Sequence, residues 1–93
     1  MFSCLVGGTL MMIAVFENRT HSLLFSKNLK NMKIACRLIN TPRQISTSCG
    51  VSVEFNDRDI RQVLVALKIS KLSTFRGVFR EIMTSTGKQY KKL

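Results

Sequence analysis

Residues 34–55 read IACRLINTPRQISTSCGVSVEF, with two apolar runs, 34–39 and 51–55, on either side of a polar segment. In each run apolar side chains alternate with other side chains, which is typical of a β-strand. Pro42 cannot donate a hydrogen bond to a neighbouring strand, so it ends the first run. The short connection predicts an antiparallel hairpin with the loop 41–50 at its tip. Within it, Cys36 is predicted to face the core as a small apolar residue.

The predicted loop carries a thiol together with a cation. Cys49 is followed by Gly50 at the start of the second strand, Ser48 stands directly before it, and Arg43 lies six residues upstream. A cation and small polar neighbours are features of reactive cysteine sites. The same residues also fit a polar hairpin loop whose cysteine is half-buried and has no chemical role. Both interpretations are open at this point.

Upstream of the hairpin, the continuous apolar run 10–16 predicts a central strand. Thr20 is a plausible N-cap, and residues 21 to about 32 place apolar side chains on one stripe of a helix. His21 is then a helix-start residue. The region before the hairpin therefore predicts a strand followed by a helix.

Downstream of the hairpin, Asn56 and Asp57 are good N-caps. Apolar residues at i, i+3, i+4 and i+7 from Ile60 onward predict a second helix. Residues 75–80 alternate and predict a fourth strand. The region after the hairpin therefore mirrors the region before it.

The resulting order is βαββαβ, which is typical of an α+β, ferredoxin-like fold with a four-stranded antiparallel sheet and two helices on one face. Right-handed crossovers predict that the fourth, first, third and second strands lie side by side in that order. We expect one domain at 9–82, a flexible extension at 1–8 and a basic tail at 83–93. No basic residue precedes Arg19, and the apolar start is short for a membrane span, so neither a signal peptide nor a membrane segment is predicted.

The chain of 93 residues has a formal net charge of +10. This charge predicts attraction to polyanions such as nucleic acid, or only a well-solvated surface. Arg37, Arg76 and Arg80 are predicted on the open sheet face, which favours nucleic-acid binding. Phe75 and Phe79 alternate with the arginines and are expected to face the helices, where they are not available to stack on bases.

Three cysteines without a C-x-x-C pair, and a single histidine, argue against a zinc site. We expect no metal and no cofactor. Free thiols favour a reducing compartment, so the protein is predicted to be cytoplasmic.

In the predicted topology the first strand ends beside the start of the third. The first helix should therefore begin near Cys49, with Thr20 lining the site. The N-terminus of a helix favours negative charge, as does Arg43, so both should favour the thiolate of Cys49. His21 is either a proton partner of the thiol or simply a helix-start residue. Gly50 leaves the approach to the sulfur open.

Residues 38–51 resemble the signature of the putative selenium/sulfur carrier protein-like family, in which a proline–arginine pair precedes a serine-rich cysteine–glycine. Here these are Pro42-Arg43 and Ser48-Cys49-Gly50. The resemblance extends over roughly residues 11–80.

The resemblance implies a carrier and not an enzyme, with the chalcogen held on Cys49 as a persulfide-type species. It implies a donor protein and an acceptor protein as partners. Two alternatives are a small basic nucleic-acid-binding module, and a protein-interaction module without chemistry that forms a homodimer.

Overall fold

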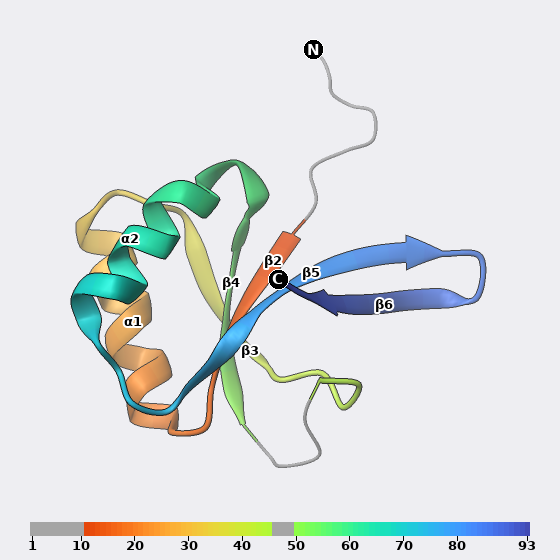
Figure 1. Cartoon of the computed structure of the whole chain (residues 1–93), viewed down its shortest axis with the longest axis horizontal. Helices are drawn as coiled ribbons and strands as arrows, with labels where there is room; N and C mark the ends of the chain where they lie inside the picture. The colour runs from red at the N-terminus through yellow and green to blue at the C-terminus, as the bar shows by residue number, and fades with distance from the viewer. Residues whose placement is uncertain (1–10, 46–49) are drawn as a thin grey trace.

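The computed structural model describes residues 11–45 and 50–93 (Figure 1). In this part of the chain five strands form one sheet, and every pair of neighbours is antiparallel. Across the sheet the strands are β3 (Cys36–Asn40), β4 (Val51–Asn56), β2 (Met11–Phe16), β5 (Phe75–Thr84) and β6 (Gly87–Lys92). The predicted order of four strands is confirmed, and a fifth strand is added beside β5.

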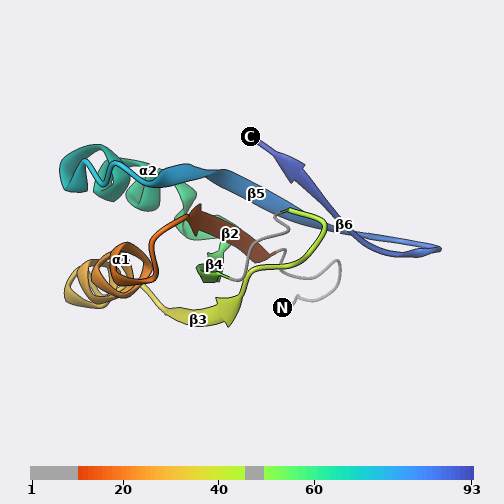
Figure 2. The same cartoon turned by 90° about the horizontal axis from the view of Figure 1, so that it is seen from below.

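Two helices of the described chain lie on the same side of the sheet, on the left in Figures 1 and 2. Helix α1 (Arg19–Asn31) follows β2, and α2 (Ile60–Ser70) follows β4 through a 3₁₀ turn, η1 (Asp57–Asp59). The α+β class is therefore confirmed. The arrangement is compatible with the predicted ferredoxin-like fold, with an additional strand.

The core lies between the helices and the central strand β2. Met12, Ala14 and Phe16 of β2 belong to one buried cluster with Phe25 and Leu29 of α1. Phe16 stacks against Phe25 with 5.3 Å between ring centroids. Residues of β2 that face away from the helices are buried as well, since Ile13 is 0% exposed. An apolar run without alternation thus marks a strand that is buried on both faces.

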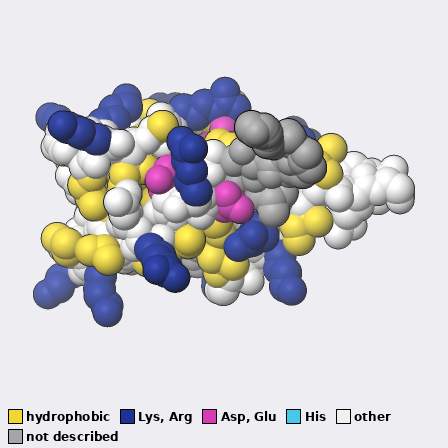
Figure 3. Space-filling view, turned by 90° about the horizontal axis from the view of Figure 1, so that it is seen from above, with side chains coloured by type: hydrophobic (Ala, Val, Ile, Leu, Met, Phe, Trp, Pro, Cys, Tyr) yellow, Lys and Arg dark blue, Asp and Glu magenta, His cyan; other side chains and the backbone are white. Residues whose placement is uncertain are grey.

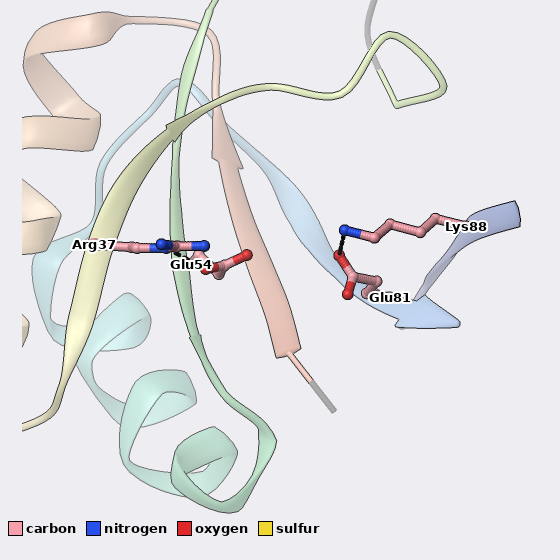
Figure 4. Close-up of polar contacts among 4 residues, drawn as sticks. All are labelled: Arg37, Glu54, Glu81 and Lys88. Atoms are coloured by element: carbon pink, nitrogen blue, oxygen red, sulfur yellow. Dashed lines mark hydrogen bonds and ion pairs between the residues drawn. The ribbon is translucent and has the colours of Figure 1, made fainter. Parts of the chain in front are cut away.

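Residues 83–93 were expected to be a basic tail, and this expectation is wrong. Their hairpin pairs Thr84 with Gly87, and the Thr84 hydroxyl donates to the Gly87 carbonyl at 2.7 Å. Lys88 forms an ion pair with Glu81 at 3.6 Å across the two strands (Figure 4). The pKa of the Tyr90 phenol is raised, mainly by partial burial and to a smaller extent by the Glu81 carboxylate. Turn chemistry and main-chain pairing therefore form a strand where the side chains are mostly polar.

The N-cap of α1 is Asn18 and not the predicted Thr20. The Asn18 side chain accepts a hydrogen bond of 2.7 Å from the Thr20 backbone N–H. Asparagine is preferred over threonine at the N-cap, so residue preference agrees with Asn18. Asn56, predicted to cap the second helix, caps the preceding turn η1 instead, accepting from the Arg58 N–H at 3.0 Å, and the N-cap position of α2 is Asp59, which makes no side-chain cap bond.

A β-bulge changes which side chains of β5 face the helices. The pairing of β2 with β5 shifts between Val15 and Phe16. As a result Phe75 contacts Phe16 on the helix side, with 5.4 Å between ring centroids. Phe79, however, pairs with Ile13 and lies on the face away from the helices, contrary to the prediction. Arg80 pairs with Met12 and lies 3.9 Å from the Asp57 carboxylate, so the three predicted arginines do not share one sheet face.

Gly77 lies next to the bulge, pairs with Val15 and has a φ of +143°. We expect Gly77→Ala to lower the free energy of unfolding by about 1–3 kcal/mol, because a side chain is strained at this φ. A Cβ there would also lie 2.8 Å from the Lys92 side chain, which can move aside. Urea denaturation checks the prediction. Lys92→Ala removes the contact but not the strain, so Gly77→Ala in that background should cost nearly as much. A much smaller cost would show that the φ is not the cause.

Candidate functional site

The loop 41–50 is closed at its base by main-chain hydrogen bonding. Asn40 pairs with Val51 in the β3–β4 ladder, and the Thr41 N–H donates to the Gly50 carbonyl at 2.9 Å. Within the loop, the Ile45 N–H donates to the Pro42 carbonyl at 3.0 Å and makes a turn. Two predicted site residues, Ser48 and Cys49, lie outside the described residues. The base of the cysteine loop is therefore defined, and the sulfur itself is not placed.

A hydrogen bond between two hydroxyls, one from half-buried Thr41 and one from buried Ser52, attaches the loop to the sheet. The Thr41 hydroxyl and the Ser52 hydroxyl share a hydrogen bond of 2.5 Å, and Ser52 is 0% exposed. A Cβ on Gly50 would lie 3.3 Å from the Thr41 hydroxyl oxygen. Glycine at position 50 thus allows Thr41 to approach the backbone closely. This packing is a reason for Gly50 that the sequence analysis did not find.

Helix α1 contacts the start of β4, directly after the loop, through its fourth residue, Ser22. The Ser22 side chain is fully buried, and its hydroxyl donates to the Val51 carbonyl at 2.5 Å. The opening turns of α1 therefore lie against the strand that starts two residues after Cys49. No acidic residue is present in the first turn of α1, so its free N–H groups present positive potential at this end of the sheet. Thr20 lies in that turn with an exposed side chain.

His21 has a defined partner within the fold. Its Nδ1 shares a hydrogen bond of 2.6 Å with the hydroxyl of Thr74, which directly precedes β5. The Thr74 carbonyl also accepts from the Glu17 N–H at 2.9 Å. Through these contacts His21 and Glu17 fix the start of α1 to the start of β5. This bonding gives a half-buried histidine at the helix start a partner within the fold.

Arg43 lies in the exposed part of the loop turn. Among the described residues, the ion pairs do not include Arg43. Its neighbour Pro42 is half-buried. The structure therefore places a solvent-accessible guanidinium in the same loop as the cysteine.

A cavity of about 180 Å³ lies between the loop and the open face of the sheet. Thr41 and Ile45 contribute the loop side, and Phe79, Arg76 and Lys92 contribute the β5–β6 side. Arg76 forms an ion pair of 2.5 Å with Glu17, which also lines the cavity. This is a small space with two cations and one acid beside the cysteine loop. Sequence reasoning missed it because Phe79 was assigned to the other face and Lys92 to a tail.

Cys36 is half-buried and packs against the core cluster, as predicted. Its thiol lies 3.6 Å from the Ser26 carbonyl, to which it donates. In the described part of the chain there is no group of side chains that could hold a metal ion. Likewise, no described helix is long and apolar enough to cross a membrane.

Comparison with known families identifies the group to which these features belong. The family described as putative Se/S carrier protein-like matches residues 11–75. The chain belongs to this family. No curated protein and no solved structure matches the chain significantly.

The family match begins at β2, includes the whole of the loop 41–50 and ends at the first residue of β5. Strand β6 lies beyond it. A carrier receives its cargo from one protein and passes it to another, so membership of a carrier-like family implies donor and acceptor partners.

Proposed function

We propose that this member of the Se/S carrier-like family holds sulfur or selenium on Cys49 as a persulfide-type species and passes it to a partner protein. The observation that carries the proposal is the family match over residues 11–75, which spans Pro42-Arg43 and Cys49-Gly50. The contact between Ser22 and Val51 supports it, because it brings the positive end of α1 to the strand that follows the cysteine.

The proposed loading step is a thiol–persulfide exchange. The Cys49 thiolate attacks the outer sulfur of a donor persulfide and forms a new S–S bond. The donor S–S bond breaks, and the donor cysteine leaves as a thiolate with the electron pair. The terminal S–H stays on the transferred sulfur, so no external oxidant or reductant is needed. Selenium transfer follows the same balance with selenium as the outer atom.

In this proposal the chain is a carrier and not an enzyme, because the transferred atom travels on the protein. Arg43 and the N-terminus of α1 stabilise the sulfur anion. Pro42, Gly50 and Thr41 shape the loop, and the bond of His21 to Thr74 gives the histidine a positioning role. A reducing cytoplasm is the proposed location, since the acceptor thiol must be free.

The test is mass spectrometry after incubation with a cysteine desulfurase and cysteine. The wild-type chain should gain the mass of one sulfur atom on the peptide that contains Cys49, and Cys49→Ser should gain none there. Cys36→Ser is the matched control and should load like the wild type. Sulfur loading that persists in Cys49→Ser, or that is lost in Cys36→Ser, would overturn the assignment to Cys49.

A further inference from the structure

An apolar groove runs between the two helices on the side of the molecule away from the sheet. It has a volume of about 310 Å³. The residues that line it are Asn28, Asn31, Met32, Ala66, Ile69 and Ser70. Ile69 is 72% exposed and Met32 is 42% exposed. Large aliphatic side chains at this level of exposure are available to a partner.

Helical periodicity extends the groove toward the other ends of the helices. Leu24 lies one turn before Asn28, and Val65 lies one turn before Ile69, so each continues a groove wall. Their exposed fractions are 46% and 52%. The groove walls therefore present four large apolar side chains from two helices: Leu24, Met32, Val65 and Ile69.

The two helices that form the groove carry basic residues and no acidic residue. The α1 and α2 segments contain Arg19, Lys27, Lys30, Arg61 and Lys68, and neither contains an acidic residue. Spacing places Lys27 one turn from Leu24, and Arg61 and Lys68 one turn on either side of Val65. Figure 3 shows Lys and Arg side chains next to hydrophobic side chains at the left end of the molecule, where the helices lie.

We propose that this groove binds an acidic amphipathic helix of a partner protein, with apolar residues on one side and carboxylates at its margins. Charge decides among the possible occupants. A second copy of the chain, with a net charge of +10, would place like charges together. A helix that is apolar on one side and acidic at its edges complements both the groove and its rim.

The floor of the groove favours a peptide over a lipid surface. The Asn28 amide donates to the Ser70 hydroxyl at 3.1 Å and joins the two helices there. A concave site with amides and a hydroxyl suits a helix that inserts its own side chains, whereas a membrane surface is best met by protruding apolar groups.

On α1 the groove lies along Asn28, Asn31 and Met32, and its extension ends at exposed Leu24, whereas buried Ser22 faces the sheet and contacts the first residue of β4. A helix bound in the groove thus leaves the loop 41–50 accessible. The inference rests on the proposed function, and it identifies how a donor or acceptor of that carrier is held.

The experiment uses a fluorescently labelled helical peptide with leucines on one face and glutamates on the others, and the full chain. Fluorescence anisotropy should show binding that weakens as salt is raised. Ile69→Glu should weaken the affinity by about tenfold or more, since it puts a carboxylate among the glutamates of the peptide. Met83→Glu is the matched control, because Met83 is 65% exposed on β5, and it should bind like the wild type.

Equal binding by Ile69→Glu and the wild type would overturn the proposal, as would equal binding of a scrambled peptide of the same composition. Binding to phosphatidylglycerol vesicles without binding to the peptide would assign the groove to lipid instead. Ile69→Glu should still load sulfur on Cys49 from inorganic polysulfide. If the wild type binds the peptide but does not load sulfur, the proposed carrier function is wrong and the proposed peptide-binding groove is still supported.

Discussion

Replacing Phe16 with alanine should lower the free energy of unfolding by about 3–5 kcal/mol. Phe16 is 1% exposed and packs against two other phenylalanines with tilted rings, its centroid 5.3 Å from that of Phe25 and 5.4 Å from that of Phe75. Alanine leaves a cavity where α1, β2 and β5 meet. Domains of this size are stable by only about 5–15 kcal/mol, so the loss is a large share of the total stability. Urea denaturation followed by circular dichroism measures the loss.

Phe75→Ala provides the matched control for this prediction. It removes the same side chain from the same aromatic cluster, but Phe75 is 37% exposed. Its loss should cost no more than about 2 kcal/mol. If both variants lose similar stability, the claim that Phe16 is more deeply buried in the core than Phe75 would be wrong.

Cys49 should react with iodoacetamide on the order of tenfold faster than Cys36 at pH 7. The expected reason is that the N-terminus of α1 and the Arg43 guanidinium favour the Cys49 thiolate. Cys36, in contrast, is half-buried and donates its thiol hydrogen to the Ser26 carbonyl.

Trypsin separates the three cysteines for this measurement. Cleavage after lysine and arginine places Cys4 in residues 1–19, Cys36 in residues 34–37 and Cys49 in residues 44–58. The alkylation rate of each is then followed against pH in one sample. Arg43→Ala should slow Cys49 at pH 7 and leave Cys36 unchanged. A Cys49 that reacts no faster than Cys4 would remove the electrostatic basis of the carrier proposal.

The elements with an apolar pattern were predictable from the sequence. Residues 11–16 of β2 have no alternation because both faces of the strand are buried, and the spacing from Ile60 onward matches helix α2. Short connections and right-handed crossovers then restrict the order of four strands to the one observed.

The features that the sequence did not predict depend on backbone geometry. Strand β6 forms from the residues GKQYKK, in which no apolar alternation indicates a strand. The side of the sheet on which Phe79 lies depends on the bulge next to Gly77. A strict two-residue alternation does not predict where such an extra residue is inserted. The N-cap of α1 is Asn18, two positions before the predicted Thr20, and both residue types occur at N-caps.

The candidate site was predictable to a similar extent. Topology correctly indicated that the start of α1 lies beside the start of β4, and the Ser22–Val51 hydrogen bond is the contact. The cavity beside the loop was not predictable, because it needs both the bulge and β6. The bond between His21 and Thr74 joins residues 53 positions apart, which no local pattern indicates.

Strand β6 ends the sheet on one side, and it carries Lys88, Lys91 and Lys92 along six residues. An unpaired edge is a template on which strands of other molecules can add and build fibrils. Three ammonium groups on that edge repel the same edge of another molecule. We therefore expect this edge of the sheet to resist strand addition even when the protein is concentrated.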